Sequence, residues 1–510
     1  MLARVMTASL TGTEGSVVTV EADISGGLPS YNVVGLAGAT VKESGERVRA
    51  AVLNAGYKYP RNRVTVNLSP ANVRKTGSHF DLAIAAAIML AMEKRDWRSL
   101  ADCAFFGELT LGGTVASVRG ALPLALCALE AGISTVVVPR GNAEEVSTAA
   151  GLRVIAADDL PDVISFMRGP ADYPAYVRQG AAAAPAGTSY PDYSDVKGQE
   201  SAKRVMEISA AGAHSMLMTG PPGSGKTMLA ERLPGILPDM TPEEKLQVTK
   251  IHSVAGLLKD GSGLVEKRPF RAPHHTITRA AMVGGGRDPE PGQISIAHYG
   301  VLFLDEVPLF DSAVLEAMRQ PLEDGRVRIS RRGSAAEFPC RVILVAAANP
   351  CRCGFAGDQT RKCTCTEREL ASYRSRLSGP VLDRIDMHVQ IPRVRYEEIE
   401  ERDCGLSSAE MKERVSLARE AQLRRYSGSV ILSNSELTPA LLRKYCPLSP
   451  ECREFLGLAY ERLGLSVRGH DRIIKVARTI ADIDGKEDID VPCIAEALQY
   501  RTGGDGGRSV

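Results

Sequence analysis

The segment from Gly220 to Thr227 constrains the fold of this chain more than any other. It reads Gly-Pro-Pro-Gly-Ser-Gly-Lys-Thr and fits the pattern G-x-x-x-x-G-K-[ST]. It follows the apolar run Ser215–Thr219 and precedes the helical run Met228–Leu233, which is the strand–loop–helix setting that a phosphate-binding loop requires. Backbone N–H groups of such a loop turn toward phosphate oxygens, and the next helix points its positive end at them. The pattern therefore predicts a nucleotide-binding α/β domain.

Individual residues of this segment and of a second one have predictable roles. Lys226 can reach the β- and γ-phosphates of a nucleotide, and the Thr227 hydroxyl can hold Mg²⁺. About eighty residues later, four apolar residues precede Asp305 and Glu306, which indicates a buried strand that delivers one carboxylate to the metal and one to an attacking water. We expect ATP and Mg²⁺ as cofactors, with nucleotide contacts from Gly220, Pro221, Pro222, Gly223, Ser224, Gly225, Lys226, Thr227 and Asp305.

Length and composition limit the remaining possibilities. A chain of 510 residues predicts about three domains at roughly 150 residues each. With 62 basic and 61 acidic residues, the net charge gives no global argument for a polyanionic partner, so any nucleic-acid surface must be local. Eleven cysteines, and polar residues within Met1–Ser16 where a signal peptide would be apolar, indicate a reducing, cytoplasmic setting. The longest apolar run, Leu82–Met92, is about half of a bilayer span, so we expect no membrane insertion.

Periodicity divides the chain into an α/β front, an α/β ATPase domain and an all-α tail. Residues 17–20 and 64–68 alternate as strands do, whereas residues 80–92 and 122–131 indicate helices. Residues 169–192 contain four prolines and no sustained periodicity, which is typical of a linker. The expected division is a first domain over 1–168, the linker over 169–192, an ATPase core with a cysteine insertion over 193–395, a helical lid over 396–502, and a disordered tail over 503–510.

The first domain resembles the protease domain of the Lon family. The resemblance rests on Gly107–Gly113, on Ala131–Pro139 and on Asn142, and it extends from about residue 67 to 146. It aligns His79 with the nucleophilic serine of that family and Leu122 with its lysine. Because a leucine cannot assist deprotonation of a hydroxyl, the resemblance implies a Lon-like fold without proteolysis, kept for assembly or for docking a substrate. We interpret His79 and Asp81 as loop and helix-cap residues.

From Val196–Gln199 onward the chain resembles the AAA+ ATPases, and within them the magnesium-chelatase-like branch with its competence-protein (ComM) subgroup. The match runs segment by segment through Arg268–His275, Gly284–Gly286, Pro291–Gly292, Ala297–His298 and Gly300–Glu306. The subgroup has the same domain order, so the resemblance covers nearly the whole chain. It implies an ATPase that works as a homo-hexameric ring.

Three further residues are candidates for the catalytic set beside Lys226 and Glu306. Asn349 follows a strand of small and β-branched residues, and its amide can hold water or the γ-phosphate; the alternative is an ordinary turn residue. Residues 377–386 resemble the family segment that carries an arginine finger, which makes Arg384 the candidate to act on a neighbouring subunit, unless it only pairs with an adjacent aspartate. In the tail, Ser466–Asp482 resembles the end of the subgroup, and the resemblance implies that Arg468, or else Arg472, meets the γ-phosphate.

Four cysteines lie between Asn349 and Arg384, as two C-x-C pairs separated by nine residues. Four thiolates in a cytoplasmic chain favour a structural Zn²⁺ site over disulfides, although C-x-C is tighter than the usual C-x₂₋₄-C spacing. Free or redox-labile thiols are the alternative. The expected ligands are Cys351, Cys353, Cys363 and Cys365. We assign this site no catalytic role.

Two insertions could contact a substrate. Residues 325–333 alternate and turn, and residues 335–340 return, which predicts a hairpin. Its arginines could grip phosphates without reading bases, and the alternative is a merely solvated charged hairpin. The residues concerned are Arg326, Arg328, Arg331 and Arg332. The segment Arg279–Arg287, with its glycine triplet, is expected to be a mobile loop like the pore insertion of chelatase-like ATPases.

The sequence leaves more than one function open. The resemblance to the ComM subgroup implies an ATP-driven motor, a branch-migration helicase on single-stranded or branched DNA in recombination or transformation, with recombination proteins as partners. The alternative is a chelatase- or chaperone-type ATPase that remodels a protein, in which case the hairpin arginines would contact an acidic polypeptide. The complete catalytic set argues against a third possibility, a binding scaffold with residual ATPase activity.

Overall fold

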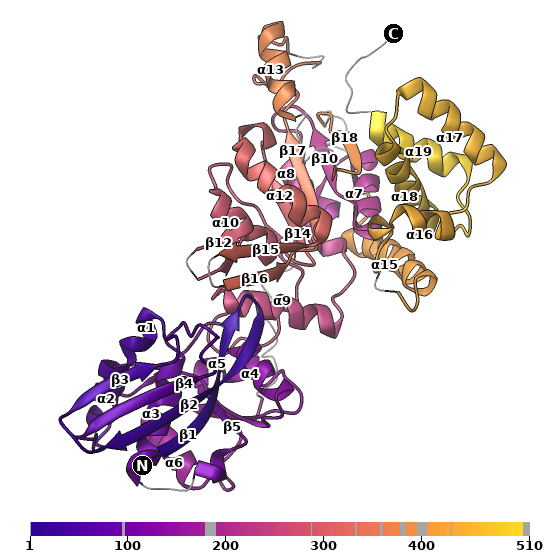
Figure 1. Cartoon of the computed structure of the whole chain (residues 1–510). Coiled ribbons are helices and arrows are strands. Elements are labelled where there is room, and N and C mark those ends of the chain that lie inside the picture. The colour runs from indigo at the N-terminus through magenta and orange to yellow at the C-terminus, as the bar shows by residue number, and fades with distance from the viewer. Residues whose placement is uncertain are drawn as a thin grey trace.

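The computed structural model shows three bodies in chain order, an α/β domain, a second α/β domain and a set of helices (Figure 1). The predicted fold class is confirmed. The structure describes residues 2–93, 97–178, 190–286, 288–331, 334–357, 361–377, 384–394, 405–429 and 431–502. Residues 179–189 of the predicted linker and the predicted tail, residues 503–510, lie outside this set.

The first domain is built on a seven-stranded mixed sheet in the order β3-β4-β2-β1-β5-β8-β9. Its longest strands, β1 and β2, form an antiparallel hairpin whose register runs from Leu2 opposite Asp23 to Thr11 opposite Glu14. The strands are β1 Leu2–Thr11, β2 Glu14–Ser25, β3 Ser30–Val34, β4 Arg63–Ser69, β5 Cys103–Phe105, β8 Thr135–Pro139 and β9 Arg153–Ala157, with the small pair β6 Glu108–Leu109 and β7 Val115–Ala116 beside them.

Helices cover this sheet. The predicted helix at residues 80–92 is α3, Phe80–Glu93, and nearly every side chain of it is buried because it is apolar on all faces. The predicted strands at 17–20 and 64–68 lie within β2 and β4, and the predicted helix at 122–131 is α4, so these four predictions are confirmed. The helices are α1 Ala39–Lys42, α2 Ser44–Asn54, α3, α4 Ala121–Glu130, α5 Arg140–Val146 and α6 Leu160–Arg168.

The second domain contains a parallel five-stranded sheet in the order β11-β14-β17-β10-β18. Because the strands are parallel, their carboxyl ends meet at one edge, where ligands of open α/β sheets bind. The strands are β10 Met216–Thr219, β11 Phe270–Arg271, β14 Val301–Leu304, β17 Ile343–Ala348 and β18 Met387–Gln390, and the main helices are α7 Glu200–Gly212, α8 Lys226–Ile236, α9 Pro242–Val254, α12 Ser312–Asp324 and α13 Glu367–Leu377.

Two insertions extend from this domain. The predicted arginine hairpin is present as β15, Arg326–Arg331, paired antiparallel with β16, Ser334–Pro339. The segment expected to be a loop at 279–287 is different: it forms the short helix α10, Arg279–Val283, and then the hairpin of β12, Gly284–Gly285, with β13, Glu290–Pro291. The Thr278 side chain caps α10, which explains why a helix begins there. The short helix α11, Gln293–Ile296, follows.

The tail is helical as predicted. Its helices are α15 Ser408–Arg425, α16 Pro439–Tyr445, α17 Pro450–Leu463, α18 Val467–Ile483 and α19 Val491–Thr502. The lid was expected from residue 396, but residues 395–404 lie outside the described part, and α15 begins at the capping box of Ser407 and Glu410. Among the described residues, none of the helices is both long and apolar enough to cross a membrane.

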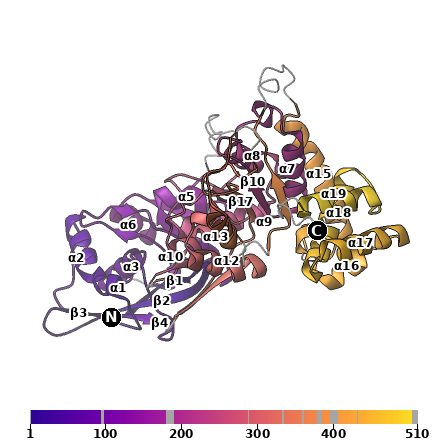
Figure 2. The same ribbon diagram turned by 90° about the horizontal axis from the view of Figure 1, so that it is seen from above.

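The first domain and the helical tail flank the ATPase domain in both views (Figures 1 and 2). Backbone hydrogen bonds join the first domain to α9 and to the loop after it, from Gly120 N–H to the Ser253 carbonyl (3.0 Å) and from Gly261 N–H to the Gly141 carbonyl (2.8 Å). The turn of the β1–β2 hairpin packs against β16. Gly12 lies so close to this strand that a Cβ placed on it would be 2.8 Å from the Glu337 carbonyl oxygen. The first domain therefore touches the arginine hairpin directly.

Candidate nucleotide site

The phosphate-binding loop connects β10 to α8 at the carboxyl edge of the parallel sheet. Gly225 precedes α8 with a φ of 86°, a left-handed conformation that favours glycine. Lys226, the first residue of α8, is buried, and its ammonium donates hydrogen bonds to the carbonyls of Gly220 (2.7 Å) and Pro221 (3.0 Å). The loop is thus closed around the lysine that is expected to meet phosphates.

Burial lowers the pKa of Lys226, while the carboxylates of Asp305 and Glu306 act in the opposite direction. A desolvated cation of this kind gains strongly from an anion placed beside it. The site therefore favours a polyanionic ligand at the end of α8, where the positive end of the helix dipole also points.

The strand β17 lies between β10 and β14, and this order brings four predicted residues together. Asn349 follows β17, and its Oδ1 lies 3.3 Å from the Lys226 Nζ. On the other side, the Thr227 hydroxyl donates to the Asp305 carboxylate over 3.3 Å. An adjacent hydroxyl and carboxylate oxygen are ligands that Mg²⁺ accepts in nucleotide sites.

Glu306 differs from the strand before it in exposure and in backbone conformation. The strand β14 before it is fully buried, whereas Asp305 and Glu306 are exposed. Glu306 has a φ of 50°, which is unfavourable for a residue with a Cβ and costs on the order of 1 kcal/mol. Its N–H donates to the Asp305 carboxylate over 2.9 Å, and this bond stabilises the turn. The turn separates the two carboxylates, so Asp305 can bind a metal ion while Glu306 lies at the exposed edge of the sheet.

Tyr373 belongs to this site, although nothing in the sequence pattern indicated it. The residue lies on α13, and its hydroxyl lies beside the backbone of Asn349, which acts to lower the pKa of that hydroxyl. Burial raises its pKa to about 12, and the charge of Glu306 acts in the same direction. Tyr373 is therefore a neutral hydroxyl that lies against the backbone of Asn349 near the carboxylate of Glu306.

A cavity of about 440 Å³ opens beside the phosphate-binding loop. Gln199, at the start of α7, lines it and donates to the Ser224 carbonyl (2.7 Å) and the Pro392 carbonyl (3.2 Å). Arg393 lines the same cavity. The sequence contained Gln199 within the Val196–Gln199 resemblance, but only the fold shows that this amide braces the loop from its outer side.

The two arginines expected to act on phosphates share a neighbour. Arg384 forms an ion pair with Glu323 of α12, and Arg468 is near enough to lower the pKa of Glu323 further. Arg468 is exposed at the start of α18. Arg472 instead lies 3.6 Å from the Asp386 carboxylate and donates to the Ile385 carbonyl, which gives it a structural role in joining α18 to the segment before β18. Arg468 therefore remains the first candidate to meet a γ-phosphate, because it is exposed while Arg472 contacts Asp386 and Ile385.

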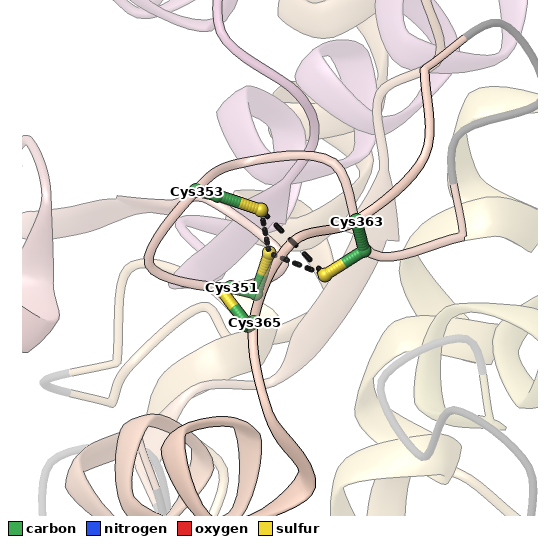
Figure 3. A group of neighbouring side chains, drawn as sticks. All are labelled: Cys351, Cys353, Cys363 and Cys365. Carbon is green, nitrogen blue, oxygen red and sulfur yellow. Dashed lines mark hydrogen bonds between the residues drawn. The ribbon is translucent and has the colours of Figure 1, made fainter.

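The four cysteines lie together (Figure 3). Their sulfur atoms are all within 4.8 Å of one another, and Cys351 Sγ is 3.3 Å from Cys353 Sγ and 3.7 Å from Cys363 Sγ. The described cysteines are unoxidised. Tetrahedral Zn²⁺ with Zn–S bonds of about 2.3 Å separates its sulfurs by about 3.8 Å, so this donor set fits zinc.

The arginine hairpin is less available for phosphates than its sequence indicated. Arg326 and Arg328 both form ion pairs with Glu337 of the opposite strand, at 2.8 Å and 3.1 Å. Arg331 ends β15, and Arg332 lies outside the described residues. Two of the four candidate arginines are therefore held by an acidic neighbour of their own hairpin.

The polar residues of the first domain that lie near the Lon-like nucleophile position have structural partners. His79 is buried against the Ala8 carbonyl at 2.9 Å, and burial lowers its pKa to about 4. Asp81 forms an ion pair with Arg47 at 2.7 Å, and Ser78 donates to Glu108. Leu122 is fully buried in α4. These contacts are those of a packed scaffold.

Three family models match consecutive parts of the chain. Residues 192–399 match the model described as magnesium chelatase, subunit ChlI. Residues 20–142 match the model for subunit ChlI of Mg-chelatase, and residues 405–501 match the ChlI C-terminal model. Each of the three bodies of the fold therefore has a counterpart in the same family.

Relatives extend this similarity over nearly the full length. The competence protein ComM of Haemophilus influenzae is 41% identical over 506 residues, which cover 98% of this chain and 97% of that protein. The protein YifB of Escherichia coli is 41% identical over 502 residues, with 98% and 97% covered. An uncharacterized protein of Mycobacterium tuberculosis is 43% identical over 505 residues, with 99% of each chain covered.

Proposed function

The chain belongs to the ComM subgroup of the magnesium-chelatase-like AAA+ ATPases, and we propose that it is a ring-forming ATPase that moves along DNA and drives branch migration. The observation that carries the ATPase part is the convergence of Lys226, Thr227, Asp305 and Asn349 at the edge of one parallel sheet. The DNA part rests on the arginine hairpin and on the similarity to ComM, which is named a competence protein.

Each residue at the sheet edge has one task in this proposal. Lys226 binds the β- and γ-phosphates of ATP, and Asn349 orients the γ-phosphate or the attacking water. Bound Mg²⁺, held by Thr227 and Asp305, neutralises charge on the phosphates. Glu306 accepts a hydrogen bond from the attacking water and aligns it with the γ-phosphorus. Tyr373 fixes the backbone of Asn349 and so keeps the amide beside Lys226.

In this proposal a second subunit completes the site. Arg384 and Arg468 both lie near Glu323, while the P-loop lies between β10 and α8. We propose that this arginine pair reaches the γ-phosphate bound by the neighbouring chain of a homo-hexamer. A guanidinium supplied in this way stabilises the transferring phosphoryl group and accelerates hydrolysis by roughly 10³–10⁵-fold.

DNA is the proposed substrate of the motor. The hairpin of β15 and β16 carries four arginines in the printed sequence, and arginines bind phosphates without reading bases. A protein substrate is the second candidate, and it is favoured by the ion pairs of Glu337 with Arg326 and Arg328, because carboxylates already occupy those arginines. We also propose a structural Zn²⁺ on the four cysteines, a cytoplasmic location and recombination proteins as partners.

One experiment separates the two substrates. ATP turnover is measured with single-stranded DNA, forked DNA, a synthetic four-way junction and an unfolded acidic protein, each at several salt concentrations. We expect DNA to accelerate ATP turnover. Four-way junctions should be separated by branch migration only when ATP is present, and DNA binding should weaken steeply as the salt concentration rises. Glu306→Gln serves as the control that binds ATP and DNA without hydrolysis. Stimulation by the acidic protein and by none of the DNA forms would replace the DNA proposal with the second candidate.

A further inference from the structure

The cysteine loop, residues 351–365, lies directly on the phosphate-binding loop. Gly354 has a φ of 86°, and a Cβ placed there would lie 2.5 Å from Cδ and 2.7 Å from Cγ of Pro222. Contacts of that length leave no room for a side chain. The backbone of the cysteine loop is therefore packed against the second proline of Gly220–Thr227, at the outer face of the nucleotide site.

The next residue connects the same loop to the cavity. The Phe355 ring lies under the guanidinium groups of Arg361 and Arg393, with centroid distances of 5.2 Å and 5.6 Å. Arg393 lines the 440 Å³ cavity together with Pro222. Stacking on an aromatic face restricts the arginine to few conformations. The Phe355 ring, held by the cysteine loop, thus contributes to the position of Arg393 at the cavity.

Both ends of the cysteine loop also lead to Asn349. Cys351 is the second residue after Asn349. After Cys365, Thr366 and Glu369 exchange capping hydrogen bonds of 2.9 Å and 3.3 Å that start α13. From α13, Tyr373 returns to the Asn349 backbone. The described residues 351–357 and 361–373 therefore leave the catalytic edge after Asn349 and come back to it at Tyr373.

The thiol cluster joins the two ends of the cysteine loop. Cys351 is fully buried, and its sulfur accepts the Ala356 N–H at 3.3 Å, the kind of bond that stabilises a metal-bound thiolate. Cys353 Sγ lies 3.5 Å from Cys363 Sγ, across nine intervening residues. Four thiolates this close repel one another unless a cation lies among them. A bound metal ion would therefore fix the loop.

We propose that the metal site on Cys351, Cys353, Cys363 and Cys365 is part of the nucleotide-binding machinery, and that a bound Zn²⁺ raises nucleotide affinity by holding Gly354 on Pro222 and Phe355 on Arg393. This inference rests on the proposed ATPase function. When zinc is lost, the loop samples other conformations and the competent site becomes a fraction of the population. If that fraction falls to about one tenth, the apparent Kd for nucleotide rises about 10-fold.

The test uses the full-length protein and a fluorescent ATP analogue with Mg²⁺ as the probe. Zinc is measured by mass spectrometry, and nucleotide Kd by fluorescence titration, in the wild type, in Cys363→Ser/Cys365→Ser and in Phe355→Ala. We expect about one zinc per wild-type chain. The double serine variant should lose zinc and bind the analogue about 10-fold more weakly. Phe355→Ala should keep its zinc and still bind more weakly, because it removes the connection to Arg393 and leaves all four thiols.

Cys127→Ala is the matched control. It removes a thiol of the first domain, and zinc content and Kd should stay at wild-type values. A wild type without zinc, or a zinc-free variant with unchanged Kd, overturns the inference and leaves the proposed ATPase function standing. If the double variant fails to fold, Phe355→Ala decides, since an unchanged Kd there also overturns the inference. A wild type that binds zinc but no nucleotide overturns the proposed function itself.

Discussion

The ammonium nitrogen of Lys226 lies 3.3 Å from the amide oxygen of Asn349, although 123 residues separate them in the chain. The sheet order explains this contact, because β10 and β17 are parallel neighbours that end at the same edge. The lysine thus lies between its own loop and the residue that is proposed to sense the γ-phosphate. A nucleotide entering the site would exchange this hydrogen bond for bonds to phosphate, and Asn349 would be left beside the transferring group.

Asn349→Ala tests this arrangement. We expect the variant to bind ATP with unchanged affinity, because Lys226 and the phosphate-binding loop remain, while turnover falls by about 10²-fold, as when one preorganised donor is removed from a transition-state site. Equilibrium titration and steady-state hydrolysis separate the two effects. Lys226→Ala is the comparison and should lose nucleotide binding. If Asn349→Ala hydrolyses ATP at the wild-type rate, Asn349 is an ordinary turn residue and does not take part in hydrolysis.

Tyr373→Phe tests the residue behind Asn349. The substitution removes only the hydroxyl that lies beside the Asn349 backbone. Loss of a polar contact worth about 0.5–1.5 kcal/mol would lower kcat by about 2- to 13-fold, with the affinity for ATP unchanged. Single-turnover hydrolysis measures the rate of the chemical step in both proteins. Tyr57→Phe, in the first domain, is the control and should hydrolyse ATP at the wild-type rate. An unchanged kcat in Tyr373→Phe would show that packing alone positions Asn349.

Arg384→Ala tests the proposed contact between subunits. Rings should form and bind ATP, and hydrolysis should fall by roughly 10³–10⁵-fold, because the transferring phosphoryl group loses a cation. Glu323→Gln is the informative companion, since it breaks the ion pair of Arg384 within one chain but leaves the arginine in place. If Arg384 leaves Glu323 on assembly, this second variant keeps its turnover. A loss in Glu323→Gln as large as in Arg384→Ala would mean that the ion pair itself is required.

Local sequence patterns predicted much of this site, because its residues follow strands. Thr219, Leu304 and Ala348 end three buried strands, and the functional residues come directly after each of them. Apolar strand runs and glycine-rich loops are visible in a sequence, so the residues at the catalytic edge of the sheet could be predicted from the sequence.

Contacts between distant segments could not be predicted in this way. The packing of Gly354 on Pro222 and the contact of Tyr373 with the Asn349 backbone depend on how a loop folds back, and no local periodicity encodes that. The loop expected at 279–287 formed a helix and a hairpin because a Thr278 cap and strand pairing outweighed its glycines. Pairing of the hairpin arginines with Glu337 required the strand register, which sets Arg328 opposite Glu337.

His298 gives the ATPase domain a predictable sensitivity to acid. It is buried, and its Nδ1 accepts the Arg341 N–H at 2.9 Å, so the ring must be neutral there. Burial lowers its pKa from 6.5 to about 3. Below pH 6.5 the unfolded chain takes up a proton that the folded chain does not, so stability falls as pH falls. Between pH 6.5 and 5 this amounts to about 2 kcal/mol, at 1.36 kcal/mol per pH unit.

Calorimetric unfolding of wild type and His298→Asn at several pH values measures this difference. The asparagine keeps an acceptor for Arg341 but cannot titrate, so we expect a lower stability at pH 7.5 and a flatter loss toward pH 5. Replacing the exposed His274 by Asn is the control and should leave the acid sensitivity of the wild type. Parallel pH curves for wild type and His298→Asn would show that other groups cause the loss.

Glu337→Gln tests whether the arginine hairpin is a DNA contact that its own carboxylate restrains. The Glu337 carboxylate holds Arg326 at 2.8 Å and Arg328 at 3.1 Å, and the glutamine keeps the size of the side chain while removing its charge. If the hairpin binds phosphates, the variant should bind single-stranded DNA more tightly than wild type, because two guanidinium groups are released. Each additional phosphate contact should steepen the dependence of log K on log salt by about 0.7 for a single strand. Glu316→Gln removes an equivalent charge from an ion pair with Arg319 on α12 and should leave both quantities near wild type. An affinity and a salt slope that do not change in Glu337→Gln would assign these arginines to the stability of the hairpin, where cross-strand ion pairs alone account for them.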